Sequence, residues 1–243
     1  MQKKRLERDL YITSDRCLWY RKEETIVIAD LHLGQESSIA SQGTTIPRIQ
    51  RDIIIDALST IIERYQPRTV VIAGDLKHEF NRNRKQEFRE VYQVMEFLRE
   101  RTSLVVVRGN HDNYLKNITN SAGIPFYEHG LPMGDYYITH GHLDLEIDGK
   151  MIMGHEHPSL RIRDDMFATL KRPCFLHHPS GITILPAFSP LSYGRDLLSG
   201  DRFISKVLQG YNMDEFRAYL VAEDGLLDLF TVGDIKEAMP DIC

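Results

Sequence analysis

The sequence has few cysteines and no long apolar run, and each absence excludes a class of protein. Its three cysteines, Cys17, Cys174 and Cys243, lie far apart and form no CxxC pair, so neither a disulfide framework nor a zinc ribbon is predicted. No window approaches the run of about 18 apolar residues that a membrane-spanning helix needs. The charged start, MQKKRLERDL, has no apolar segment behind it that would indicate a signal peptide. We therefore expect a cytoplasmic protein with reduced thiols.

Low complexity and a strong net charge are also missing. The 243 residues include 16 glycines and 10 prolines without a repeating period, which excludes a collagen-like chain. Hydrophobic residues make up 42% of the chain, enough to bury a core, so disorder is not expected. The formal charge of -5 argues against a broadly basic nucleic-acid surface but leaves a local basic groove open.

The first half of the chain alternates strand-like runs with helical periodicity. Runs at 25–29, 69–73 and 104–107 have the β-branched composition of buried strands. Helical periodicity fills 46–65, where Pro47 suits a first helical turn, and recurs at 88–98. The apolar positions of the first helical segment recur every three or four residues: Ile49, Ile53, Ala57, Leu58, Ile61 and Ile62. This alternation predicts a parallel sheet with helical crossovers.

After about residue 125 the pattern becomes mostly β. Strand-like runs at 136–139, 150–153, 167–176 and 181–187 follow one another without a long helix. Two further runs, at 216–220 and 226–232, flank Asp224-Gly225, a strong hairpin signal. No linker or repeat interrupts the chain, so we expect one domain over 1–243, with a packed C-terminal extension from about residue 200.

Polar residues of metal-ligand type follow five of these strands. The segments are DLH at 30–32, GD at 74–75, GNHD at 109–112, HGH at 140–142 and GHEH at 154–157. Ligands of α/β sheets collect at the carboxyl ends of parallel strands, so these side chains should converge. In Asp-x-His and His-x-His the two side chains share one face if the segment is extended. The donors are imidazole, carboxylate and amide groups, which suit Mn, Fe or Zn, and they are too many for one ion.

These segments, in this order, resemble the signature of the calcineurin-like metallophosphoesterase superfamily, which is D-x-H, G-D, G-N-H-D, a lone H and G-H-x-H. The match spans about residues 25–160. More narrowly, GDLKHEF at 74–80 and LPAFSPLSYG at 185–194 look similar to the small archaeal phosphoesterases related to SbcD-type DNA repair nucleases. Those nucleases usually carry an extra DNA-capping region, for which this chain has little room after GHEH. The resemblance implies an α/β fold, a four-layer α/β/β/α sandwich with two mixed β-sheets.

The resemblance also implies a ligand set for two divalent ions. One ion would be held by Asp30, His32, Asp75 and His157, and the other by Asp75, Asn110, His140 and His155. With Asp75 as the bridge, the ions would activate a bridging water as hydroxide for in-line attack at phosphorus. Manganese is the first expectation, and Fe, Zn, Co and Ni are alternatives because these ligands accept all of them.

Two residues beside the ligands are candidate catalytic groups. By the same resemblance, His111 would donate a proton to the leaving alkoxide or stabilise the phosphoryl oxygens. Asp112 would orient the ring of His111, although it could equally cap a helix that begins at Asn113.

Other polar residues have competing interpretations. His78 could line the substrate site or lie in a solvated loop, and Ser189 and Tyr193 could line it if the narrower resemblance holds. The related pattern has Asn at the position of Ser189 and Gly at that of Tyr193, which weakens a substrate role. His142 and Glu156 are expected to be structural, and His177-His178 to lie in a surface turn.

Two stretches are rich in arginine and lysine. Residues 81–89 (NRNRKQEFR) could hold a phosphate backbone, but a solvated loop and helix start is favoured. The second stretch, 161–172, also contains Asp164 and Asp165, which makes phosphate binding there still less favoured.

We therefore expect a two-metal phosphoesterase that hydrolyses phosphodiester bonds of DNA, RNA or nucleotides, without a membrane partner. One alternative is a small-molecule phosphatase or cyclic-nucleotide phosphodiesterase with the same centre, because fold and metals do not choose the substrate. Another is a non-catalytic interaction module, as in the retromer subunit that resembles this fold. The sequence leaves the oligomeric state open, including a homodimer.

Overall fold

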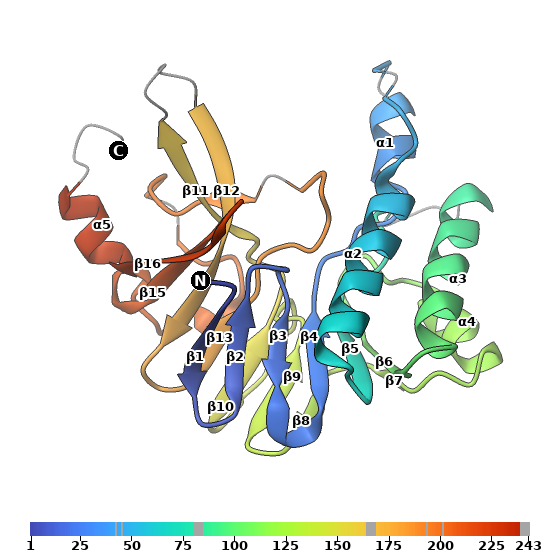
Figure 1. Cartoon of the computed structure of the whole chain (residues 1–243), viewed down its shortest axis with the longest axis horizontal. Helices are drawn as coiled ribbons and strands as arrows, with labels where there is room; N and C mark the ends of the chain where they lie inside the picture. Colours follow the sequence, from blue (N-terminus) through green and yellow to red (C-terminus); the bar gives the residue numbers. More distant parts are fainter. Residues whose placement is uncertain are drawn as a thin grey trace.

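Two β-sheets pack face to face and carry helices on their outer sides (Figure 1). The computed structural model describes residues 1–41, 43–44, 46–79, 85–163, 169–192, 194–200 and 202–238. Both sheets mix parallel and antiparallel pairs, so the predicted α/β sandwich with two mixed sheets is confirmed. Within the described ranges, no helix combines the length and apolar character that crossing a membrane requires.

The first sheet has seven strands in sequential order and changes from antiparallel to parallel pairing at its fourth strand. The strands are β1 (Lys3–Glu7), β2 (Leu10–Thr13), β3 (Leu18–Tyr20), β4 (Thr25–Ile28), β5 (Thr69–Ala73), β6 (Ser103–Val107) and β7 (Phe126–Tyr127). Thr25 aligns with Thr69, which aligns with Ser103. The carboxyl ends of β4, β5 and β6 therefore lie together at one edge of the sheet.

The second sheet has nine strands and takes in the C-terminal part of the chain. The strands are β8 (Leu131–Met133), β9 (Tyr136–Thr139), β10 (Lys150–Met153), β11 (Pro158–Arg163), β12 (Thr169–His178), β13 (Ile182–Ile184), β14 (Arg195–Asp196), β15 (Arg217–Ala222) and β16 (Gly225–Thr231). The predicted hairpin is confirmed, because Ala222 aligns with Gly225 across the turn. β15 also pairs with β12, which joins the residues after 200 to this sheet.

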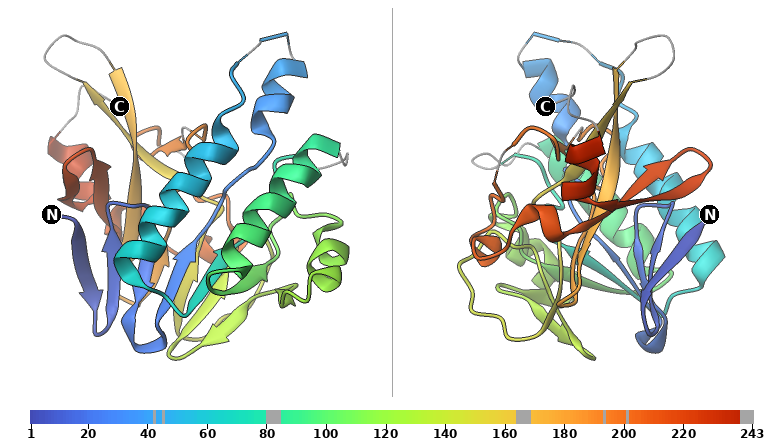
Figure 2. Two further views of the ribbon diagram at one scale, coloured as in Figure 1. Left: turned by 45° about the vertical axis from the view of Figure 1, so that its right-hand side comes forward. Right: turned by 90° about the vertical axis from the view of Figure 1, so that its left-hand side faces the viewer.

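Within the described residues, five α-helices and three short 3-10 helices complete the layers. They are α1 (Gln35–Ser41), α2 (Gln50–Tyr65), α3 (Lys85–Arg99), α4 (Leu115–Ser121), α5 (Val232–Ala238), η1 (Arg21–Glu23), η2 (Lys206–Leu208) and η3 (Met213–Glu215). Figures 1 and 2 show α2 and α3 side by side over the first sheet. On the far side, α5 buries Val232 and Ile235 against the second sheet.

The central strands are buried on both faces, which explains their continuous apolar sequence. Ile26 and Ile28 of β4 belong to the core beneath the helices. Val27 and Ala29 belong to the core between the two sheets. This double burial fixes the strand register, because a slip of one residue would exchange the two faces.

Helix α2 begins later than the sequence predicts. It starts at Gln50 rather than near Pro47, because one carboxylate oxygen of Glu36 accepts the N–H groups of Ile49 and Gln50, each at 2.7 Å. A first turn through Pro47 is therefore not needed to satisfy these donors.

The predicted apolar face of α2 is confirmed in its second half, where Leu58 and Ile61 are buried and Ala57 and Ile62 pack against the core, but it is wrong at the start of the helix. Ile49 and Ile53 are 51% and 39% exposed. The buried residues are Gln50, Ile54, Leu58 and Ile61. Because Ile53, Ile54 and Ile55 are adjacent, apolar periodicity alone fits either of two neighbouring faces of the helix.

The described cysteines are free thiols. Cys17 and Cys174 are both buried, and burial raises the pKa of Cys17 to about 12. Both are therefore expected to be unreactive. Cys243 lies outside the described residues.

Candidate metal centre

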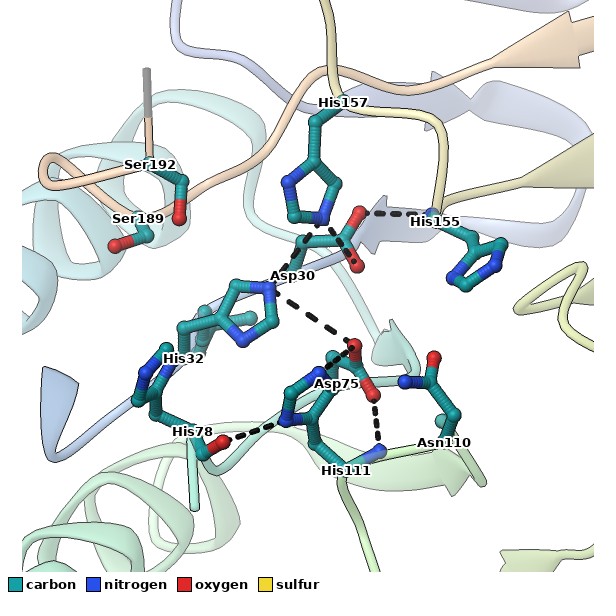
Figure 3. Close-up of polar contacts among 12 residues, drawn as sticks. Asp30, His32, Asp75, His78, Asn110, His111, His155, His157, Ser189 and Ser192 are labelled. Carbon is teal, nitrogen blue, oxygen red and sulfur yellow. Dashed lines mark hydrogen bonds and ion pairs between the residues drawn. The ribbon is translucent and has the colours of Figure 1, made fainter. Parts of the chain in front are cut away.

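The structure brings all seven predicted ligands to one place, at the carboxyl ends of β4, β5, β6, β9 and β10. Figure 3 labels all of them except His140. They fall into two groups, and Asp75 of the second group also lies within 4.8 Å of His32 of the first, in a further group with His111. Asp30, His32 and His157 offer donor atoms within 4.8 Å of one another, and so do Asp75, His140 and His155.

In the first group, the rings of His32 and His157 bring their Nε2 atoms together beside the buried carboxylate of Asp30. Nε2 of His32 lies 3.3 Å from Nε2 of His157, which in turn lies 3.1 Å from Oδ1 of Asp30. Oδ2 of Asp75 is 3.9 Å from the His32 nitrogen. Asp75 is therefore close enough to bind an ion held by this first group as well as an ion held by the second.

In the second group, His140 lies between a carboxylate and an amide. Its Nε2 is 3.4 Å from Oδ2 of Asp75 and 3.0 Å from Oδ1 of Asn110. Its Nδ1 lies 3.0 Å from the carbonyl oxygen of Ala73. A ring that donates Nδ1–H to a carbonyl presents the lone pair of Nε2, which is the usual arrangement of a metal-binding histidine.

The donor set fits divalent metal ions. Asp30 is fully buried and Asp75 is 2% exposed, and buried charges in proteins are paired or bind metals. The Nε2 atoms of His32 and His157 lie only 3.3 Å apart. A cation bound by both nitrogens would account for this close approach. Imidazole, carboxylate and amide donors without thiolate suit Mn, Fe, Zn or related ions.

The backbone of the ligand loops is turned into the left-handed region. Asp30, His32, Asp75, His155 and His157 all have φ between 44° and 71°. The extended conformation predicted for DLH and GHEH is therefore wrong. Such conformations cost about 1–3 kcal/mol each and concentrate at functional sites. They persist here because the loops are tied together, for example by the N–H of His32 donating to the carbonyl of Asp75 at 2.9 Å.

Gly154 is required by close packing rather than by its φ angle. A Cβ added there would lie 2.6 Å from the Cβ of Ala29 and 2.7 Å from Oδ2 of Asp30. We expect Gly154→Ala to destabilise the fold by about 1–3 kcal/mol and to weaken metal binding by displacing Asp30. Thermal unfolding and metal content measure the two effects.

Gly210→Ala is the matched control for that variant, because a Cβ at Gly210 would meet nothing within 4 Å. It should leave both the melting temperature and the metal content unchanged. Equal behaviour of the two alanine variants would contradict the packing argument.

In the metal-free protein, His140 carries a proton that a metal ion must displace. Burial lowers the pKa of His140, but the carboxylates of Asp75 and Asp30 outweigh it and raise the pKa to about 9. The folded value exceeds the usual 6.5, so this proton stabilises the metal-free protein below pH 6.5, and the stabilisation disappears as pH rises through 9. Metal binding through Nε2 requires the neutral ring.

We therefore expect metal binding near pH 7.5 to release about one proton from His140, and affinity to rise with pH towards 9. Calorimetric titration of the metal-free protein in buffers of different ionisation enthalpy measures this release. A binding enthalpy that does not depend on the buffer would exclude it. His129→Ala, at an exposed position outside the ligand groups, should release the same number of protons as the unmodified chain.

His111 lies beside the two ligand groups, but neither predicted set of ligands includes its ring. Its backbone N–H donates to Oδ1 of Asp75 at 2.9 Å, and its Nε2 lies 3.9 Å from Oδ2 of the same residue. Its Nδ1 is 2.5 Å from the carbonyl oxygen of His78. The ring of His78 stacks on that of His111, with centroids 5.8 Å apart.

The two interpretations of Asp112 both need correction. Its carboxylate accepts the N–H of Gly109 at 2.8 Å and that of Lys77 at 3.3 Å. The contact to Nδ1 of His111 comes from the carbonyl of His78 instead. The nearby helix begins at Leu115, and its N-cap Tyr114 has no side-chain cap. Asp112, only 1% exposed, therefore ties the loops of β5 and β6 together.

Ser189 is not placed to meet a substrate. It is 1% exposed, and its hydroxyl accepts from Nε2 of Gln50 at 3.0 Å, away from the histidines (Figure 3). Ser192 lines the pocket instead, beside Gln35. Tyr193 lies outside the described residues.

A pocket of about 480 Å³ opens onto the metal-ligand groups. The predicted residues on its walls are His32, Asp75, His78, Asn110, His111, His155 and His157. The walls also contain Gln35, Leu191, Ser192, Arg195 and Ile204, which the sequence analysis missed. Leu191 and Ser192 belong to the LPAFSPLSYG segment, whereas Gln35, Arg195 and Ile204 lie in no recognised motif and are brought beside the ligand loops by the fold alone.

Glu156 keeps the structural character expected of it, but the surface turn predicted for His177-His178 is wrong, because both residues end strand β12 and pair with β13. Glu156 accepts the N–H of Ser205 at 2.7 Å and pairs with Arg195 at 3.1 Å. Nδ1 of His177 contacts the hydroxyl of Thr183 at 3.0 Å. His142 lies 5.3 Å from His140 between ring centroids, and burial lowers its pKa to about 4.

The two basic stretches are only partly described. Residues 80–84 and 164–168, with Arg82 and Arg84, lie outside the described residues. In the part that is described, Arg161 pairs with Asp196 at 3.2 Å and Arg172 with Glu223 at 2.6 Å. These two arginines are therefore neutralised by neighbouring carboxylates.

One solved structure shares this fold. The chain is similar to the crystal structure of a nuclease, MPE, from Pseudomonas putida, with 18% identity, a TM-score of 0.66, and 90% of this chain and 94% of that chain covered. It is less similar to Yfce, a phosphoesterase from E. coli, with 15% identity, a TM-score of 0.42, and 86% and 93% covered. A comparison with curated protein sequences finds no match.

A protein-family model described as calcineurin-like phosphoesterase matches residues 24–218. The matched region holds every predicted metal ligand. The family acts on phosphoric ester bonds with divalent metal ions, which the converging histidines and aspartates could hold. This chain therefore belongs to the calcineurin-like phosphoesterase family and is a hydrolase of phosphoester bonds.

Proposed function

We propose that the chain is a two-metal phosphodiesterase acting on nucleic acid or nucleotides. The observation that carries this proposal is the sharing of Asp75 by two ligand groups, with His111 beside them on the wall of one pocket. One group would be Asp30, His32, Asp75 and His157, and the other Asp75, Asn110, His140 and His155. Manganese is the proposed ion, with Fe, Zn, Co or Ni as alternatives.

When bound, two such ions would lower the pKa of water and neutralise charge that develops on the phosphoryl oxygens. The side chains of the protein then have separate tasks. The carboxylates of Asp30 and Asp75 would supply the negative charge that holds the cations, and the neutral histidines would fix their positions. Burial lowers the pKa of His32 to about 3 and that of His155 to about 4, so both rings are neutral and ready to bind at neutral pH.

His111 is the proposed general acid. With Nδ1 held by the carbonyl of His78, its Nε2–H would give its proton to the leaving oxygen as the P–O bond breaks, and solvent would return the proton afterwards. Nucleoside alkoxides are poor leaving groups, so this proton transfer is expected to contribute about 10²–10⁴-fold to their cleavage. The ring of His78, also on the pocket wall, is proposed to contact the phosphoryl group.

The charge of the pocket favours a diester over a monoester. Among its described lining residues, Arg195 is the one lysine or arginine, and it is already paired with Glu156. A diester carries a single negative charge, whereas a monoester near neutral pH carries about two. A pocket with little free positive charge beyond the metals suits the diester.

The test is a comparison of substrates in the presence of manganese. We expect hydrolysis of bis-p-nitrophenyl phosphate and of labelled single-stranded DNA, and little hydrolysis of p-nitrophenyl phosphate. Preference for the monoester would contradict the diester assignment and favour a small-molecule phosphatase. Cleavage of the diester and of cyclic nucleotides but not of DNA or RNA would favour a nucleotide phosphodiesterase. Inactivity with every metal would favour a non-catalytic module.

A further inference from the structure

A buried glutamate at the start of α3 lies beneath the loop that carries His78. Glu87 is 1% exposed, and its Oε1 accepts the N–H of Glu79 at 2.6 Å and that of His78 at 3.0 Å. The His78 N–H is shared with the carbonyl of Leu33 at 2.9 Å. One carboxylate oxygen therefore holds two consecutive peptide groups of this loop.

The same loop sets the ring of His111. The carbonyl oxygen of His78 lies 2.5 Å from Nδ1 of His111 (Figure 3). On the opposite side, Asp112 accepts the N–H of Lys77 at 3.3 Å, and the buried ammonium group of Lys77 donates to the carbonyl of Glu79. Residues 77–79 are thus held between two buried carboxylates, and His111 takes its orientation from the peptide between them.

The fold leaves a space that Glu87 fills. Gly34, at the end of the DLHLG segment, has φ +87°, and a Cβ there would lie 2.9 Å from Cγ of Glu87. Gly34 thus lets the glutamate approach the loop after β4 while its carboxylate reaches the loop after β5. A solvated helix start, as the charged sequence around Glu87 suggests, would need neither the glycine nor the burial.

We propose that Glu87 is a positioning residue for the general acid: it fixes the peptide of His78, whose carbonyl orients the ring of His111. The proposal rests on the proposed function, because it assumes that His111 protonates the leaving group. Loss of the carboxylate would free the peptides of His78 and Glu79. The ring of His111 would then lose the carbonyl that aims its Nε2 into the pocket.

The test uses the leaving-group dependence of general-acid catalysis. p-Nitrophenolate leaves without protonation, whereas a nucleoside alkoxide needs it. The two substrates are thymidine 5′-p-nitrophenyl phosphate and the dinucleotide TpT. We expect Glu87→Ala to lower kcat for TpT by about 10–100-fold, part of the full general-acid contribution. We expect kcat for the p-nitrophenyl ester, KM for both substrates and metal content to stay near the unmodified values.

Three further variants separate positioning from general stability. Glu87→Gln keeps an acceptor oxygen and should restore most of the TpT activity. Glu87→Asp, shorter by one methylene, should show the same pattern as Glu87→Ala more weakly, and it serves if the alanine variant fails to fold. Glu96→Ala removes a half-exposed carboxylate of the same helix and should behave as the unmodified chain.

A double variant gives the sharpest outcome. If Glu87 acts through His111, Glu87→Ala should cost nothing further for TpT in a His111→Ala background. Equal losses on both substrates, or additive losses in the double variant, would overturn the positioning role and leave the proposed function standing. If His111→Ala itself showed no leaving-group dependence, the general acid of the proposed function would fail, and this inference with it.

Discussion

Replacing Asp75 by asparagine is expected to remove both metal ions and to lower hydrolysis by about a thousandfold or more, since bound metals contribute several kcal/mol to such reactions. The carboxylate of Asp75 lies within reach of both groups, with its Oδ2 3.4 Å from Nε2 of His140 and 3.9 Å from Nε2 of His32. Asparagine keeps the size and the oxygen that accepts the N–H of His111. It removes the negative charge.

The charge matters because histidines surround this carboxylate. Burial raises the pKa of Asp75, but the neighbouring imidazoles, led by His140, outweigh it and hold the pKa well below its usual range. The carboxylate is therefore ionised throughout the range in which the protein would be assayed. A neutral amide leaves Asp30 as the one carboxylate among the seven proposed ligands, which is too little negative charge for two divalent cations.

Elemental analysis of the purified variant, together with turnover of bis-p-nitrophenyl phosphate, measures the effect of Asp75→Asn. Asp144→Asn is the control, because that side chain is 77% exposed and makes only a long ion pair, 3.8 Å, with the exposed Lys206. A full complement of metal in Asp75→Asn would contradict the assignment of Asp75 as the shared ligand.

The second large effect is expected at His111. His111→Ala should lower kcat for a nucleoside diester by about 10²–10⁴-fold, while metal content and KM change little. The ring contributes one nitrogen to the carbonyl of His78 and presents the other towards Asp75 and the pocket. Its removal takes away the proton donor, but all seven proposed ligands remain.

Metal content decides between two roles for His111. Its ring also lies within 4.8 Å of donor atoms of His32 and Asp75, so it could complete a ligand group of its own. Loss of an ion in His111→Ala would show that it is a ligand rather than the general acid. His129→Ala, at an exposed position outside the ligand groups, should change neither metal content nor rate.

The ligands could be predicted from the sequence because each lies just after a recognisable strand. DLH, GD and GNHD follow β4, β5 and β6, whose parallel register brings their carboxyl ends together. His140, His155 and His157 follow β9 and β10, which are parallel neighbours in the other sheet. Strand order and residue type were enough to place these groups in one site.

The orientation of individual side chains could not be predicted in the same way. The left-handed conformations of Asp30 and His32 depend on hydrogen bonds to the neighbouring loop after β5. Ser189 and Ser192 lie in one irregular segment, and its path turns one hydroxyl into the core and the other into the pocket.

Buried acidic residues were the hardest to anticipate. Glu36 and Glu87 lie in polar stretches that are typical of solvated helix starts, yet they are 3% and 1% exposed. Each accepts two backbone N–H groups that would otherwise be unsatisfied. No local pattern distinguishes such a glutamate from an exposed one, because its partners come from another part of the chain.

The central claim is that two ions, held around Asp75, carry one hydrolytic reaction. The most direct measurement is a titration of the metal-free protein with Mn²⁺, in which bound manganese and turnover of bis-p-nitrophenyl phosphate are followed together. The account predicts two bound ions per chain, with turnover that appears mainly as the second ion binds. Full turnover with one ion per chain, or turnover without any metal, would contradict it.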